Sequence, residues 1–279
     1  MMVREQEIRF LLDGAFYRLA YVEAGDPRGP PVVCVHGLTG NGRDFDPLME
    51  ALSARFLVIA PDLPGRGRSE WLAKAALYQP VSYVQALAHL LAAIGRDVMW
   101  IGTSLGGICG MMIAAAPGQP IVRMVLNDIG PYIPAAALQR IRDYMVAAPE
   151  SFADQAALEA YLRRVHAPFG RLPDESWERM ARLSARPLSG GGMALHYDPR
   201  IAEPIRAEAP RPIEMWDLWE RIRVPVLTVR GQQSDLLLPE TLRRMEASGA
   251  QSLTVPGAGH APALADQRSI DAIVGFLSG

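Results

Sequence analysis

Short apolar runs that alternate with helical stretches constrain the fold of this chain more than any other feature. Near the N-terminus, residues 8–12 and 17–23 predict a β-hairpin that turns at Asp13-Gly14. Later apolar runs are typical of buried strands, and they cover residues 32–35, 56–60, 98–101 and 121–126. Helical spacing of apolar residues lies between the strands, over residues 45–52, 81–94 and 105–116. This alternation predicts a largely parallel sheet covered by helices on both faces.

A helical segment interrupts the alternation after residue 130. It shows no convincing strand, and proline and glycine residues separate its helical runs, which include 135–148 and 155–165. The earlier pattern then returns, with strands at 224–230 and 252–255 and helices at 239–247 and 266–277. We therefore expect a core of residues 1–130 and 221–279, with a helical cap of residues 131–220.

The composition limits the classes of protein that this chain can belong to. Its 279 residues are 49% apolar, which is enough for a large core, and its net charge of -2 argues against nucleic-acid and membrane-surface partners. No apolar run approaches the roughly 18 residues of a spanning helix, and residues 1–10 lack the apolar stretch of a secretory signal. We expect a cytoplasmic protein that acts on a small molecule, with its oligomeric state left open.

The two cysteines do not indicate a disulfide scaffold or a metal site. Cys34 falls in a predicted strand and Cys109 in a predicted helix, where both are expected to be small buried side chains. The cysteines and histidines do not have the spacing of metal ligands. The sequence therefore predicts chemistry that needs neither a metal nor an organic cofactor.

The sequence Gly102-Thr103-Ser104-Leu105-Gly106 joins a predicted buried strand to a predicted apolar helix. A sharp turn in this setting strains the serine backbone and exposes its hydroxyl, while the flanking glycines let strand and helix pack closely. The free N–H groups at the start of the helix then point towards the hydroxyl. Ser104 is therefore predicted to be a nucleophile.

A nucleophilic serine needs a base and hydrogen-bond donors for the developing oxyanion. His260, in the glycine-rich loop after the strand at 252–255, is the predicted base, because its ordinary pKa lies near neutral pH. The backbone N–H groups of Leu105 and Leu38 are the predicted oxyanion donors. Leu38 belongs to a glycine-rich loop that begins at His36, and a structural role is the better interpretation of His36 itself.

Two carboxylates compete for the role of orienting the base. Asp235 follows the strand at 224–230, and Asp128 follows the strand at 121–126. We favour Asp235. The order serine, aspartate, histidine along the chain is the one that this constellation adopts after a strand–turn–helix serine.

Together these motifs resemble those of the α/β-hydrolase superfamily over essentially the whole chain. Residues 62–69 are similar to the D-x-x-G-x-G-x-S loop of that family, with Arg66 where many members have histidine. The resemblance implies an eight-stranded, mostly parallel sheet and a helical cap between the sixth and seventh strands. Capped members include carboxylesterases, enol-lactonases and carbon–carbon hydrolases of ring-cleavage products.

The resemblance and the motifs predict a serine hydrolase that acts on a carboxylic ester or lactone through an acyl-enzyme. A carbon–carbon hydrolase is the first alternative, although such enzymes often carry an aromatic residue after the catalytic histidine, where this chain has Ala261. The second alternative is a non-catalytic binding protein on the same fold. Aromatic residues of the cap, Phe169 among them, are expected to form its small core with one or two facing the site. Its clustered arginines, residues 163, 164, 179, 182 and 186, are expected to form a solvated face.

Overall fold

The computed structural model describes residues 2–206 and 209–279. Its central sheet has eight strands in the order β1-β2-β4-β3-β5-β6-β11-β12. Their bounds are β1 Arg4–Leu12, β2 Ala15–Ala24, β3 Pro31–Val35, β4 Leu57–Pro61, β5 Val98–Thr103, β6 Ile121–Asn127, β11 Val226–Gly231 and β12 Gln251–Val255. The β1–β2 and β2–β4 pairs are antiparallel and the others parallel. The predicted mostly parallel sheet and the N-terminal hairpin are confirmed.

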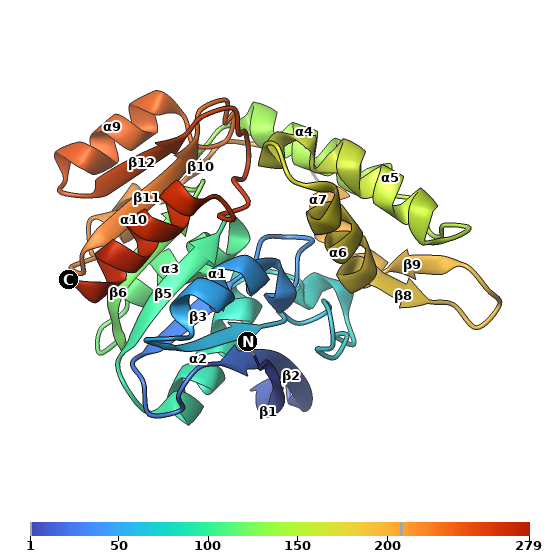
Figure 1. The fold of residues 1–279 in the computed structure, drawn as a ribbon, viewed down its shortest axis with the longest axis horizontal. Helices are drawn as coiled ribbons and strands as arrows, with labels where there is room; N and C mark the ends of the chain where they lie inside the picture. The colour runs from blue at the N-terminus through green and yellow to red at the C-terminus, as the bar shows by residue number, and fades with distance from the viewer. Residues whose placement is uncertain (1, 207–208) are drawn as a thin grey trace.

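Helices cover both faces of this sheet, as Figure 1 shows. The helices of the core are α1 Asp46–Leu52, α2 Pro80–Ile94, α3 Leu105–Ala114, α9 Pro239–Ala247 and α10 Gln267–Ser278, with 3-10 turns η1 Gly42–Phe45 and η2 Ala75–Leu77. Strand β3 shows why the apolar runs are continuous. Val33 and Val35 belong to the buried cluster on the side of α2 and α3, while Val32 and Cys34 belong to the cluster on the side of α1 and α10. Every side chain of such a strand is buried, on one face or the other.

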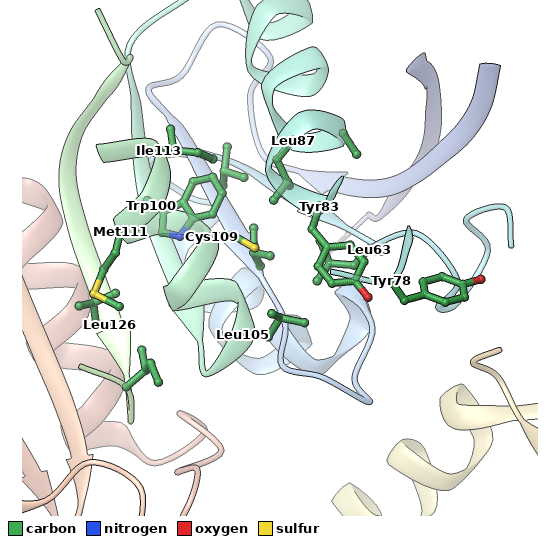
Figure 2. Packing of buried hydrophobic residues seen from close by; sticks show 14 of the residues in the cluster. Leu63, Tyr78, Tyr83, Leu87, Trp100, Leu105, Cys109, Met111, Ile113 and Leu126 are labelled. Atoms are coloured by element: carbon green, nitrogen blue, oxygen red, sulfur yellow. The ribbon is translucent and has the colours of Figure 1, made fainter. Parts of the chain in front are cut away.

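On the side of the sheet covered by α2 and α3, the buried cluster contains Trp100, whose side chain is fully buried (Figure 2). Its indole Nε1–H donates to the carbonyl oxygen of Gly106 at 3.1 Å, which fixes α3 against β5. Cys109 and Met111, on α3, are fully buried beside it. Cys109 and Cys34 are free thiols, as predicted, and burial raises the pKa of each, that of Cys109 to about 12.

Between β6 and β11 the chain forms the cap segment, which we define as residues 131–220 and which the structure describes except for residues 207 and 208. Figure 1 shows its helices α4 to α7 gathered at one end of the sheet. The helices of this segment are α4 Ala135–Val146, α5 Gln155–Val165, α6 Asp174–Ser184, α7 Glu203–Arg206 and α8 Trp216–Trp219, with turns η3 Ala167–Phe169 and η4 Pro199–Ala202.

The expectation that the cap segment lacks strands is wrong. Two small antiparallel sheets form there, from β7 Tyr132–Ile133 with β10 Ile213–Glu214 and from β8 Ala185–Pro187 with β9 Met193–Leu195. Strands of two or three residues are too short to show an alternating pattern. The glycine run at 190–192 separates β8 from β9, and Gly191 and Gly192 have φ values of 89° and 77°, which glycine adopts without strain.

His196 attaches the cap segment to the core. Its Nδ1 accepts a hydrogen bond from the Gly67 N–H at 2.7 Å, so the proton lies on Nε2, which contacts the Thr39 carbonyl oxygen at 3.2 Å. Asp198 adds a second attachment, because it accepts from the Tyr78 hydroxyl at 2.6 Å. Burial lowers the pKa of His196 to about 4, so the ring is neutral at physiological pH.

Within the described residues, no helix is long and apolar enough to cross a membrane.

Candidate active site

Ser104 lies on the turn between β5 and α3, and its backbone is strained. Its φ of 50° lies in the left-handed region, and its N–H donates to the Asn127 carbonyl oxygen at 3.0 Å, which anchors the turn to β6. The glycines that flank the serine are required by close packing. A Cβ on Gly102 would overlap the carbonyl oxygen of Gly106, and a Cβ on Gly106 would overlap that of Val35. The strained turn predicted from the sequence is therefore present.

The structure brings His260 against Ser104. The imidazole lies in the loop after β12, and its Nε2 is 3.0 Å from Ser104 Oγ. Its side chain is 11% exposed, so the ring is largely shielded from water and yet reaches the cavity in front of the serine. An Nε2 at this distance can accept the hydroxyl proton directly.

The carboxylate behind the imidazole belongs to Asp128, at the carboxyl end of β6. Its Oδ2 lies 2.8 Å from His260 Nδ1 and also accepts from the Ser234 hydroxyl at 2.5 Å. Its Oδ1 accepts from the Gly231 N–H at 2.8 Å. The side chain is fully buried, and these donors satisfy a charge that burial would otherwise disfavour. A carboxylate here holds the Nδ1–H tautomer, which leaves Nε2 as the acceptor.

The expectation that Asp235 contacts the imidazole is wrong. Asp235 forms a bidentate pair with Arg140 of α4, at 2.6 Å from Nε and 2.8 Å from Nη2, and its side chain is 48% exposed. The loop after β11 does support the site as the sequence suggested, but through different groups. The N–H of Gly231 and the hydroxyl of Ser234 hold Asp128, and Asp235, one residue further, points away towards the cap segment.

The loop that carries Leu38 passes beside Ser104. A Cβ on Gly37 would lie 3.7 Å from Ser104 Cβ. His36 Nδ1 bonds the Gly37 carbonyl oxygen at 2.7 Å, and His36 Nε2 accepts from a backbone N–H at 2.9 Å. Because a trans peptide points its C=O and N–H in opposite directions, this bond turns the Leu38 N–H away from the ring. Both ring nitrogens of His36 are used by the backbone, as its expected structural role requires.

Arg66 holds the next peptide of this loop. Its Nε donates to the Leu38 carbonyl oxygen at 3.0 Å, and its guanidinium lies 4.7 Å from the ring centre of Tyr83. The side chain is fully buried, so a positive charge lies behind the loop. Burial lowers the pKa of His36 to about 3, and the nearby charge of Arg66 also lowers it, so the ring is neutral.

A cavity lies in front of Ser104 and His260, between the core and the cap segment. Its walls combine apolar side chains with a few polar groups. The lining residues include Asp44, Arg140, Tyr144, His166 and Phe169. The His166 ring stacks on Phe169 at 4.4 Å, and burial, with the nearby charge of His260, lowers the pKa of His166 to about 4. This lining is typical of a small-molecule site.

Two polar residues of this region, Arg140 and Asn127, were not predicted from the sequence. Phe169 lines the cavity, as expected of one or two aromatic residues of the cap. Trp177 is buried and does not line it, as expected of the remaining aromatic residues. None of the five clustered cap arginines lines this cavity within the described residues, but Arg140 does. Asn127 was also missed: its Nδ2 donates to the Pro262 carbonyl oxygen at 2.8 Å and so holds the loop of His260. A polar residue at the carboxyl end of a buried strand was the available signal for it.

The fold and this site define an α/β hydrolase, and comparison with known proteins agrees. The profile described as "Alpha/beta hydrolase family" matches residues 32–272, and the chain belongs to that family. It is 41% identical to a 3-hydroxybutyrate-oligomer hydrolase from Cupriavidus necator, over 98% of this chain and 97% of the relative. It is 29% identical to a 2-(acetamidomethylene)succinate hydrolase from Mesorhizobium japonicum, over 83% and 82%.

A solved structure gives the same result for the fold. The crystal structure of an alpha/beta hydrolase from Novosphingobium aromaticivorans superposes with a TM-score of 0.88 at 34% identity, covering 99% of this chain and 98% of that one. The chain is therefore a hydrolase.

Proposed function

We propose that this hydrolase cleaves a small carboxylic ester through Ser104, His260 and Asp128. The observation that carries the proposal is the unbroken chain of contacts from Ser104 Oγ to His260 Nε2, at 3.0 Å, and from His260 Nδ1 to Asp128 Oδ2, at 2.8 Å. Nucleophile, base and orienting carboxylate are within hydrogen-bond reach of one another, as acyl transfer requires.

The steps follow from these positions. Ser104 Oγ attacks the ester carbonyl carbon while His260 Nε2 takes the hydroxyl proton. The carbonyl oxygen becomes an oxyanion, which accepts hydrogen bonds from the N–H groups of Leu38 and Leu105. His260 then gives its proton to the leaving alcohol, and an acyl-enzyme remains on Ser104. Water then attacks the acyl carbon while His260 Nε2 takes its proton, and His260 returns this proton to Ser104 Oγ as the acid is released. Asp128 stabilises the imidazolium formed in each half of the reaction.

The preferred substrate class that we propose is an ester of a 3-hydroxy acid, of the 3-hydroxybutyrate type. The support is the 41% identity, over nearly the full length of both chains, to a 3-hydroxybutyrate-oligomer hydrolase. In such an oligomer the hydroxyl of one unit is joined to the carboxyl of the next through an ester. Ala261 after the histidine, in place of an aromatic side chain, favours esters over carbon–carbon bonds.

Substitution of Ser104 tests the proposal. Ser104→Ala should abolish hydrolysis of the 3-hydroxybutyrate dimer and of p-nitrophenyl butyrate, and should abolish labelling by a fluorophosphonate. Ser252→Ala, at an exposed serine on β12 that bonds Glu246, is the matched control and should retain both. Residual turnover in Ser104→Ala at the wild-type rate would refute the mechanism, and a wild-type protein that takes no label would favour the non-catalytic alternative.

A further inference from the structure

Arg140 is the one lysine or arginine among the described residues that line the cavity in front of Ser104. It projects from α4, so the cap segment supplies the positive charge of a site whose nucleophile and base come from the core. Its Nε and Nη2 are engaged by Asp235, whereas its Nη1 donates to no group within the described part of the chain. A guanidinium carries five N–H donors, so part of this fork is available to a ligand.

The Arg140–Asp235 pair is half-exposed and therefore exchangeable. The two side chains are 37% and 48% exposed, and ion pairs of this kind contribute little to stability because water screens them. A second carboxylate that enters the cavity meets a cation that is already positioned by one anion. Planar bidentate recognition of carboxylates is the chemistry for which arginine is best suited.

The pair lies on the histidine side of Ser104. Asp235 follows Ser234 in the chain, and the Ser234 hydroxyl bonds the same Asp128 oxygen that holds the imidazole. The leaving oxygen of an ester must lie near His260 Nε2 to receive its proton. In a 3-hydroxy acid only two carbon atoms separate that oxygen from the carboxylate carbon, so the acid group of the leaving unit is carried towards Arg140.

We propose that Arg140 binds the free carboxylate of the leaving unit, so that the enzyme removes one 3-hydroxy acid at a time from the carboxyl end of its substrate. This inference rests on the proposed function and specifies its binding mode. Asp235 holds the guanidinium in place and competes with the substrate for it.

Asp44, an acidic residue that also lines the cavity, fits this orientation. Asp44 lies on η1, which begins just after the loop of Leu38, and it also lines a small adjoining cavity with residues of α6. Its carboxyl group accepts from the Asn41 N–H at 3.2 Å, and Arg140 does not line this adjoining cavity. The substrate end that lies there bears a hydroxyl and no charge, so it is not repelled.

The test compares the 3-hydroxybutyrate dimer with its methyl ester, which lacks the charge. In Arg140→Gln the ratio of kcat/KM for the acid to that for the methyl ester should fall by about ten- to a hundredfold, the range for losing a charge-assisted contact. Asp235→Asn should raise this ratio, because the competing carboxylate is removed. Arg142→Gln, which removes a cation from the same helix at a position outside the cavity lining, should leave the ratio unchanged.

A purely structural attachment of cap to core gives a different pattern. If the pair only fixes α4, then Arg140→Gln and Asp235→Asn will lower turnover of both substrates alike with no change in the ratio, which overturns the proposal. Calorimetric binding of 3-hydroxybutyrate and of its methyl ester separates this inference from the proposed function. Arg140-dependent binding of the acid without ester turnover would support the subsite and refute the esterase, whereas equal binding by wild type and Arg140→Gln would overturn the subsite.

Discussion

Replacing Asp128 with asparagine should reduce kcat/KM for p-nitrophenyl butyrate by about 10⁴-fold, or about 5.4 kcal/mol of transition-state stabilisation. The structure explains the size of the effect. Asp128 Oδ1 accepts from the Gly231 N–H, so the asparagine oxygen occupies that position and its NH₂ group replaces Oδ2. The NH₂ then faces His260 Nδ1 as a donor. His260 must carry its proton on Nε2 instead, and cannot accept the hydroxyl proton of Ser104.

The assay is initial-rate hydrolysis across pH 6–9, with the rate of fluorophosphonate labelling as an independent measure of nucleophile activation. Because Asp128 is fully buried, far-UV circular dichroism and a thermal melt must show that the variant is folded. The contrasting variant is Asp235→Asn, which removes the carboxylate that the sequence favoured and should cost far less. A folded Asp128→Asn enzyme within tenfold of wild type, or a larger loss in Asp235→Asn, would refute the assignment.

Three further predictions follow from the packing and the hydrogen bonds. Gly106→Ala should lower the free energy of unfolding by about 3 kcal/mol, measured by urea titration, because its Cβ meets a strand carbonyl; an unchanged midpoint would contradict this. Burial lowers the pKa of His196 to about 4, so this residue is protonated at a higher pH in the unfolded chain than in the folded protein. The free energy of unfolding should therefore decrease as the pH drops below about 6.5, by up to about 1.4 kcal/mol per pH unit. Melts of His196→Asn between pH 7 and 4.5 should therefore show a shallower acid dependence than wild type, and equal slopes would count against it. Asn127→Ala frees the Pro262 carbonyl and should lower kcat about tenfold with a smaller change in KM, in steady-state assays of p-nitrophenyl butyrate; a change in KM alone would argue against a positioning role.

The features that the sequence predicted correctly are those with a local cause. Apolar alternation located the strands of the large sheet, and the requirement for glycine at positions 102 and 106 marked the strained turn at Ser104. The Leu38 loop likewise lies beside the serine, since a Cβ on Gly37 would lie 3.7 Å from Ser104 Cβ. Each of these depends on residues that are close in the chain, where spacing carries the information.

The choice between two carboxylates depended on side-chain direction, which spacing does not encode. Asp128 and Asp235 both follow strands of the sheet, and β6 and β11 are neighbours in it. The deciding facts are that Asp128 collects hydrogen bonds from Gly231 and Ser234, while Asp235 has a cation from the cap segment within reach. That cation, Arg140, lies 95 residues away in the chain, so no local pattern connects the two.

The contacts around the imidazole have a consequence for engineering the enzyme. Among the residues that the structure describes, those that bond His260 or Asp128 through a side chain or backbone N–H lie outside the inserted stretch between β6 and β11, and they are Ser104, Gly231 and Ser234. That stretch supplies Arg140, His166 and Phe169 to the wall opposite. The proposed proton transfer and the substrate preference thus depend mainly on different stretches of the chain, which meet where the Gly259 N–H donates to the Pro168 carbonyl oxygen at 2.6 Å. A chimera that exchanges the stretch between two relatives should inherit its reaction from one parent and its preference from the other.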